Sequence, residues 1–353
     1  MGSNPIARSL KAADLQVGGL FHFMSWTDTM KALLVIAAFT CHAEPEKPNL
    51  PDFDQPVMFN TPEADKILAA MQVFPRDNPW NEDISQRPVA ANSNRMIAGI
   101  GADKRLAYNL DMSFIIIPAN QQKVALKIVH FARESDKGPF PIPDNAPLED
   151  WPVNGKELRS YQREKAEGDR HLILVDPHNQ RLHEFWQARL TDAGWEASCA
   201  ATFDLSSNKL RPDGWTSSDA AGLPIFPAVI RFDECERGLV EHAMRFTVKR
   251  SRRAYVYPAT HFASRSTDPN LPRMGERFRL RADFDVSKFS PHVRAILRGL
   301  KKYGMFVADN GGDWRLSVAP DARIKGLDEL RKLRGSDFEV IVTTSPNEGP
   351  RKK

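Results

Sequence analysis

The sequence carries little net charge and no concentrated basic segment. Its 49 basic and 45 acidic residues leave a formal net charge of +4 over 353 residues. The two signs are interspersed, as in residues 277–283, so the sequence lacks the clustered lysines and arginines that bind a phosphate backbone. Nucleic acid is therefore not an expected partner.

The motifs of several common enzyme classes are missing. The sequence contains no G-x-S-x-G nucleophile elbow, no H-E-x-x-H zinc motif, no phosphate-binding P-loop and no dinucleotide-binding glycine fingerprint. These absences disfavour the corresponding hydrolases, metalloproteases and nucleotide-dependent enzymes. Since no motif indicates a cofactor, we expect none.

The apolar run near the N terminus is too short to span a bilayer. It covers residues 32–39, whereas a transmembrane helix needs roughly 20 residues. Met30 and Lys31 precede it, and a small residue, Ala43, comes before a polar, proline-rich stretch. This order is typical of a secretory signal. We predict a start at Met30 and a secreted or periplasmic protein with no stable membrane span after cleavage; a buried helix is the alternative.

Composition divides the chain into four parts. We predict a signal region over residues 1–43, a proline-rich linker over 44–60, a single globular β-rich domain over 61–342 and a disordered basic tail over 343–353. Cleavage would leave two cysteines, Cys199 and Cys235. In an oxidising compartment they could pair, but Cys199 lies on an apolar strand face and could equally be a free core residue.

Short strand signals outnumber helix signals. The 26 prolines among 353 residues exceed the usual proline share of ~5%. This excess indicates irregular connections between short strands. One helix is predicted to begin at Thr61-Pro62, and another at Ser290-Pro291, with Gly304 as its terminator. Regular alternation of strands and helices is missing. The fold class is therefore predicted to be mainly β or α+β, with an antiparallel β-sandwich-like core and a few peripheral helices.

Three hairpins are predicted from polar turns between apolar segments. They join residues 171–176 to 181–186, 114–117 to 124–129, and 305–308 to 314–318. Residues 195–205 should continue the sheet. Residues 240–248 and 277–286 alternate in polarity as strands do, so the charged face of the latter must be solvated or paired.

The candidate catalytic residues are polar side chains in strand or loop contexts: His171, Glu184, Arg245, His261 and Asp268. His171 precedes an apolar strand, and His261 and Asp268 lie in a long irregular loop of the kind that carries function. Burial of Glu184 would raise its pKa and suit a general acid. Each also has a structural interpretation: a turn-bracing histidine, a solvated glutamate, or an ion-paired Arg245.

Aromatic and histidine residues supply two further hypotheses. Trp80, Trp215 and Tyr257 are the candidate substrate-binding residues, because exposed aromatic rings can stack on sugars. His171, His178 and His183 could form a three-histidine zinc site. The turn at His178 would have to fold back over its hairpin to do so, and no metal ligand is assigned.

Several motifs together resemble a family of secreted bacterial proteins without an assigned function. They are NPWNEDIS at residues 78–85, ESDKGP at 134–139, GDRH at 168–171, GWTSSDAAGLP at 214–224, PATH at 258–261 and KYGMFVADN at 302–310. The resemblance covers roughly residues 74–340. It implies export and one continuous domain but assigns no catalytic residue, and the sequence departs from the family pattern around residues 102–112.

The leading functional hypothesis is a carbohydrate-active protein that cleaves or binds glycans. A glycan or cell-envelope ligand is the expected partner. For cleavage, Glu184 and Asp268 would have to lie roughly 5–10 Å apart across the scissile bond. The alternatives are a non-catalytic envelope or extracellular binding protein and a zinc-dependent hydrolase.

Overall fold

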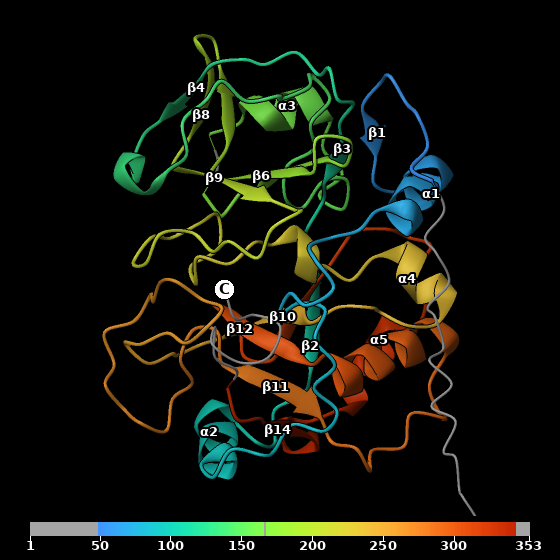
Figure 1. The fold of residues 1–353 in the computed structure, drawn as a ribbon, viewed down its shortest axis with the longest axis vertical. Helices are drawn as coiled ribbons and strands as arrows, with labels where there is room; N and C mark the ends of the chain where they lie inside the picture. Colours follow the sequence, from blue (N-terminus) through green and yellow to red (C-terminus); the bar gives the residue numbers. More distant parts are fainter. Residues whose placement is uncertain (1–48, 166, 344–353) are drawn as a thin grey trace, which may run out of the picture. The chain divides into compact units, whose positions relative to one another are not determined.

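The computed structural model describes residues 49–165 and 167–343 (Figure 1). The predicted signal region lies outside these residues, as does nearly all of the predicted tail. None of the helices in the described part of the chain is both long and apolar enough to cross a membrane.

Three sheets build the fold. The first has the strand order β1-β3-β5-β6-β9, the second β14-β11-β12-β10-β13-β2 and the third β4-β8-β7. In chain order the strands are β1 Val57–Met58, β2 Ala107–Leu110, β3 Ile115–Ile116, β4 Leu126–Ile128, β5 Leu172–Asp176, β6 Arg181–Trp186, β7 Arg189–Thr191, β8 Gly194–Ala197, β9 Cys199–Asp204, β10 Met244–Val248, β11 Arg277–Leu280, β12 Met305–Asn310, β13 Arg315–Val318 and β14 Phe338–Val340.

The helices are short and few. They are α1 Pro62–Ala70, α2 Ser93–Ile100, α3 Leu158–Arg163, α4 Phe232–Arg237 and α5 Pro291–Lys302, with 3₁₀ turns η1 Ala132–Glu134, η2 Phe226–Ala228, η3 Leu327–Lys332 and η4 Gly335–Asp337. Both predicted helix starts are confirmed. Thr61 caps α1 by accepting the amide of Ala64 at 3.2 Å, and Pro291 occupies the first turn of α5.

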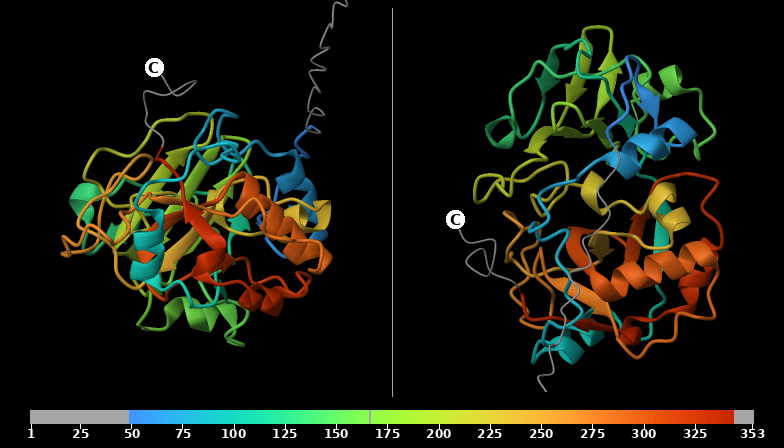
Figure 2. Two further views of the ribbon diagram at one scale, coloured as in Figure 1. Left: turned by 90° about the horizontal axis from the view of Figure 1, so that it is seen from below. Right: turned by 45° about the vertical axis from the view of Figure 1, so that its right-hand side comes forward.

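The β-rich α+β prediction is confirmed, but the pairing is mixed. Strands β10 and β12, β13 and β2, β3 and β5, and β4 and β8 run parallel. The five-stranded sheet is buried on both faces. Ile173 and Val175 belong to the core shared with the six-stranded sheet, whereas Leu172 and Leu174 face a second core under the three-stranded sheet. Figure 2 shows this layering from two further directions.

Aromatic rings fill the core on the six-stranded sheet. Trp314 is fully buried and stacks on Phe246 and Phe338, with ring centroids 5.6 and 5.4 Å away. Phe278 meets the same indole edge-on at 5.7 Å. These four rings tie β10, β11 and β14 to the residue that precedes β13.

One predicted hairpin is confirmed and two are wrong. Strands β5 and β6 pair antiparallel as predicted. Strand β3 pairs instead with β1 and β5, and β4 pairs with β8. Strands β12 and β13 do not pair with each other because β10 lies between them. Partners from distant parts of the chain displaced the sequence neighbours in both cases.

The charged side chains of β11 are buried and paired. Arg277 binds Glu82 at 2.9 Å, and Arg279 binds Glu339 at 2.7 Å. A buried guanidinium needs such a partner, since an uncompensated buried charge is strongly destabilising. The two cysteines, Cys199 and Cys235, are both buried and free, so the disulfide alternative does not hold in this structure.

The folded part begins before the predicted N-terminal limit of the domain. Within the predicted linker, Val57 and Met58 form β1, and Phe59 is buried. Near the C terminus, β14 lies within the predicted domain and pairs with β11.

Phe246→Ala should lower the free energy of unfolding by about 3–5 kcal/mol, because it leaves a cavity between the rings of Trp314 and Phe278. Urea unfolding monitored by circular dichroism measures the change. Val89→Ala is the control, since Val89 is 46% exposed and its truncation should change stability by less than about 0.5 kcal/mol. A loss below about 1 kcal/mol for Phe246→Ala would contradict the assigned packing.

Candidate functional site

One segment connects most of the predicted catalytic residues. Residues 216–226, here called the linking segment, pass between the five-stranded and six-stranded sheets (Figure 1). Four of the five predicted residues bond to it: His171 to Ser218, Arg245 to Asp219, His261 to the carbonyl of Ala220, and Glu184 to the amides of Ile225 and Phe226. Among the described residues, Asp268 makes no hydrogen bond or ion pair with this segment and bonds only within its own loop.

A buried ion pair holds the linking segment against β10. Arg245 donates from Nε and Nη2 to the two carboxylate oxygens of Asp219, both at 2.8 Å. Its Nη1 donates to Ser317 Oγ on β13. Both charged side chains are almost completely buried. Since each charge compensates the other, removal of either one would leave an unpaired buried charge.

His171 sits directly before β5 and faces the linking segment. Its Nδ1 lies 2.9 Å from Ser218 Oγ. The residue is 2% exposed, and this burial lowers the pKa of His171 to about 4. The imidazole is therefore neutral near pH 7, and its Nε2 is not occupied by the contact with Ser218.

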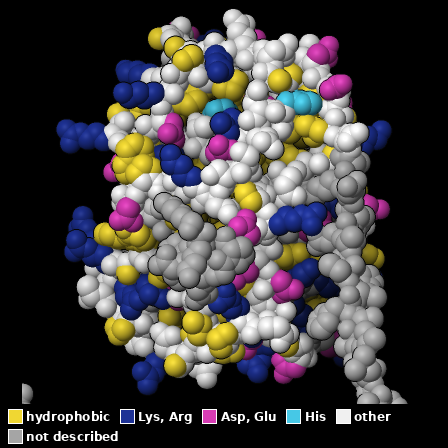
Figure 3. Space-filling view, in the orientation of Figure 1, with side chains coloured by type: hydrophobic (Ala, Val, Ile, Leu, Met, Phe, Trp, Pro, Cys, Tyr) yellow, Lys and Arg dark blue, Asp and Glu magenta, His cyan; other side chains and the backbone are white. Residues whose placement is uncertain are grey.

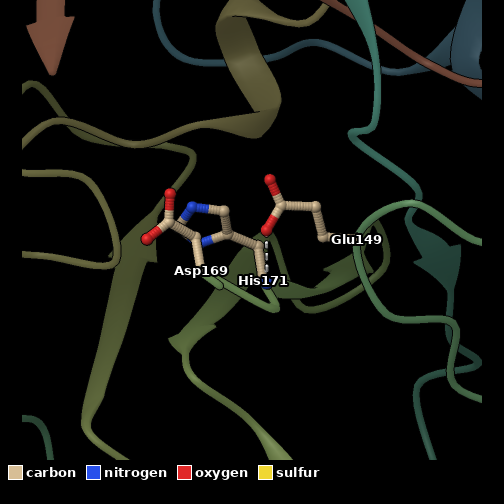
Figure 4. Close-up of side chains that lie close together, drawn as sticks. All are labelled: Glu149, Asp169 and His171. Carbon is tan, nitrogen blue, oxygen red and sulfur yellow. Dashed lines mark hydrogen bonds between the residues drawn. The ribbon is translucent and has the colours of Figure 1, made fainter. Parts of the chain in front are cut away.

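Two carboxylates lie beside this imidazole. One oxygen of Glu149, one oxygen of Asp169 and one ring nitrogen of His171 all lie within 4.8 Å of one another (Figure 4). Glu149 is positioned by backbone pairing: its amide donates to the carbonyl of His171 at 2.8 Å, and the amide of His171 donates to Glu149 Oε2 at 3.2 Å. Two chain segments thus bring three reactive groups together.

The two carboxylates have different environments. Asp169 is exposed, and its Oδ1 accepts a hydrogen bond from Trp186 Nε1 at 2.9 Å. Glu149 is partly buried. Burial, reinforced by the negative charge of Asp169, raises the pKa of Glu149 to about 7. A pair of neighbouring carboxyl groups in unequal surroundings is a common arrangement for acid–base catalysis.

Two further carboxyl groups reach this region from the six-stranded sheet. Burial and then the charge of Glu149 raise the pKa of Asp111 to about 7, while burial and then Asp219 raise that of Asp309 to about 8. Asp111 is 7% exposed, and its buried Oδ1 has no hydrogen-bond partner. Its carbonyl accepts the amide of Asp150, which follows Glu149 directly.

Unusual backbone conformations flank the site. Asp150, Arg170 and Gln187 have φ values of 70°, 44° and 54°, and each directly follows a site residue: Glu149, Asp169 or Trp186. Left-handed conformations are uncommon for residues other than glycine and concentrate at functional sites.

Glu184 and Asp268, the predicted catalytic pair, lie in different environments. Glu184 is completely buried, and its two carboxylate oxygens accept the amides of Ile225 and Phe226 at 2.8–2.9 Å. Burial raises the pKa of Glu184 to about 8. Asp268 is exposed and accepts the amide of Asn270 in its own loop. A glycan could reach Glu184 only if the linking segment moved.

The predicted substrate-binding residues differ in how far they are buried. Trp80 is 2% exposed and packs edge-on against Phe306, so no face of its ring is available to a sugar. Trp215 is partly buried, with the guanidinium of Arg211 5.6 Å from its ring centroid. Tyr257 is also partly buried.

The three histidines of the zinc hypothesis do not gather. His178 is exposed in its turn, and His183 bonds through Nδ1 to Thr202 Oγ1 at 2.9 Å. Over residues 49–165 and 167–343, the group of side chains that could hold a metal ion is Glu149, Asp169 and His171. Only one of the three histidines belongs to it.

Sequence reasoning missed most of the carboxylates around the site. Asp169, Asp219 and Asp309 lie in motifs that carried the family resemblance, at residues 168–171, 214–224 and 302–310, and this was the available signal. Nothing in the sequence singles out Asp111 or Glu149. Both become close to the site only through tertiary pairing.

The charges on the surface are mixed. Figure 3 shows basic and acidic side chains intermingled over the part of this face that is not covered by grey atoms. Comparison of the chain with protein-family models, with curated proteins and with solved structures finds no match. The geometry of the site itself is therefore the basis for a functional assignment.

Glu184→Gln should change how stability depends on pH. The folded-state pKa of about 8 exceeds the ordinary glutamate pKa of 4.5, so between these values the folded protein keeps a proton that the unfolded chain releases. Stability contributed by this group is therefore present at low pH and is lost as pH rises to about 8. The variant should gain stability relative to the native protein between pH 5 and pH 8.

Urea unfolding at pH 5, 6, 7 and 8 measures this difference. The exposed Glu167→Gln is the matched control and should follow the native pH dependence. A constant offset between Glu184→Gln and the native protein over the whole range would show that the carboxyl group is not protonated in the folded state.

Proposed function

We propose that this protein is a retaining glycoside hydrolase that acts on glycans in the periplasm or outside the cell. Glu149 is the general acid and base, and Asp169 is the nucleophile. The observation that carries the proposal is the approach of these two carboxylates within 4.8 Å. Retaining enzymes place their two carboxyl groups about 5–5.5 Å apart, whereas inverting enzymes need roughly 6.5–9.5 Å to admit a water molecule.

The unequal environments support these roles. A general acid must hold its proton at the working pH, and a pKa of about 7 lets Glu149 do so near neutrality. A nucleophile must reach the anomeric carbon. Asp169 is exposed and oriented by the indole N–H of Trp186.

The first step transfers the sugar to the enzyme. One oxygen of Asp169 forms a bond to the anomeric carbon while the glycosidic C–O bond breaks. Glu149 donates its proton to the departing oxygen, which leaves as a hydroxyl group. The backbone hydrogen bond from His171 occupies Oε2, so Oε1 is the oxygen placed to carry the transferred proton.

The second step reverses the roles. The ionised Glu149 takes a proton from water, whose oxygen attacks the anomeric carbon and displaces Asp169. The product therefore keeps the configuration of the substrate, and both carboxyl groups return to their starting states.

The surrounding network positions these groups. His171 holds Glu149 through two backbone contacts and is itself held by Ser218. The ion pair of Arg245 with Asp219 fixes the linking segment that carries Ser218. This proposal replaces Glu184 and Asp268 as the catalytic pair and keeps His171 and Arg245 as positioning residues.

Glu149→Gln should lower kcat by roughly 10²–10⁴-fold, because the amide cannot donate the required proton. Asp169→Asn should lower it at least as much. In the native enzyme kcat/KM should fall as pH rises above about 7, since Glu149 then loses its proton. Initial rates on a panel of aryl glycosides and polysaccharides from pH 4 to 9 measure both effects.

The control variant is Asp268→Asn, which removes an exposed carboxylate of the same type and should retain native rates. Proton NMR of the first-formed product should show retained configuration. An equal loss in Asp268→Asn, or an inverted product, would overturn the assignment. Tight glycan binding without cleavage would favour the alternative of a non-catalytic binding protein.

A metal-dependent hydrolase is the second candidate. The two carboxylates and the imidazole are a suitable ligand set, and the unpartnered Oδ1 of Asp111 offers a further oxygen in the same region. Zn²⁺ accepts this mixture of nitrogen and oxygen ligands and would supply a Lewis acid that activates water.

Chelation separates the two candidates. Under the glycosidase proposal, protein dialysed against EDTA should keep its activity within about twofold. Loss of activity that returns on addition of Zn²⁺ or Mn²⁺ would instead establish the metal-dependent reaction. In that case His171→Ala should weaken metal binding measured by calorimetry, whereas His178→Ala, from the exposed turn, should not.

A further inference from the structure

Phe131 is exposed next to the site although its ring is apolar. It is 40% exposed, more than any other Phe, Tyr or Trp side chain of the described residues. Its backbone is firmly held: its amide donates to the carbonyl of Ser198 at 2.8 Å, and its carbonyl accepts Ser135 Oγ at 2.8 Å. The ring is thus presented to solvent by an ordered backbone.

A second ring extends this surface to Asp169. The ring centroid of Trp186 lies 5.8 Å from that of Phe131, with the ring planes tilted by 53°. Trp186 is partly exposed and donates from Nε1 to Asp169 Oδ1 at 2.9 Å. One indole therefore contacts both the exposed phenyl ring and the proposed nucleophile.

Polar groups border the two rings. Ser198 Oγ lies 2.7 Å from His130 Nδ1 and donates to Gln187 Oε1 at 2.6 Å. The amide of Gln187 donates to the carbonyl of Asp169 at 2.7 Å. His130 is exposed and Gln187 partly exposed, so hydroxyl groups of a ligand could bond there.

We infer that Phe131 and Trp186 form a sugar-binding subsite for a neutral pyranose next to the scissile bond. The inference rests on the proposed function and names the substrate class of that site. The C–H groups on one face of a pyranose pack on aromatic rings, and its hydroxyl groups need polar partners at the edge. A carboxylate bonded to the indole disfavours an anionic sugar at this position.

Binding is measured in the Glu149→Gln background, where the ligand is not turned over. Isothermal titration calorimetry with neutral hexasaccharides of glucose, xylose, mannose and N-acetylglucosamine identifies the sugar bound best. Adding Phe131→Ala should weaken that binding about tenfold. Val129→Ala is the matched control, since Val129 is 39% exposed two residues away but has no ring, and it should change affinity by less than about twofold.

Trp186→Phe separates the two contacts of the indole. The phenyl ring keeps an aromatic face but cannot donate to Asp169. In the enzyme that retains Glu149, kcat should therefore fall more than affinity.

A uronic acid hexasaccharide should bind at least about tenfold more weakly than the best neutral one.

The inference is overturned if Phe131→Ala and Val129→Ala bind alike, or if the uronic acid oligomer binds best. Failure of the proposed function looks different. If the native chain binds a neutral hexasaccharide in a Phe131-dependent way but never cleaves it, the subsite stands and the hydrolase assignment falls.

Discussion

The buried pair of Arg245 and Asp219 is the interaction on which the arrangement of the site depends. Both charges lie between the two large sheets, where neither can be solvated. An unpaired charge there would be strongly destabilising, so the pair fixes the linking segment against β10. Ser218 precedes Asp219 and holds His171. The ion pair thereby also helps to position His171, which directly precedes β5.

The remaining contacts of the linking segment provide hydrogen-bond partners for its buried backbone amides. A chain passing between two sheets must find hydrogen-bond partners for its amides. Glu184 supplies them for Ile225 and Phe226. The sequence suggests Glu184 as a general acid, but in the structure its carboxylate accepts the backbone amides of this segment. Its raised pKa follows from the same burial and needs no catalytic role.

The site is built from several chain segments, and the sequence pattern predicts the positions of only some of them. His171 and Asp169 lie beside the β5–β6 hairpin, which the sequence predicts because the two strands are close in the chain and share a short polar turn. Glu149 joins them through an isolated bridge between Leu148 and Leu172. Asp111 directly follows β2 and Asp309 lies in β12, and both strands belong to the six-stranded sheet. Their approach depends on pairings that no local pattern reveals.

The sequence alone determined the α+β class and the local structure, namely the helix starts at Thr61 and Pro291 and the β5–β6 hairpin. These features are predictable because propensity, capping and short turns act between near neighbours in the chain. The tertiary structure decided which strands pair across long separations, as when β10 inserts between β12 and β13. It also decided which carboxylates meet. Coulomb interaction and burial depend on distance in space, and Glu149 and Asp169 are 20 positions apart in the sequence but within 4.8 Å in the fold.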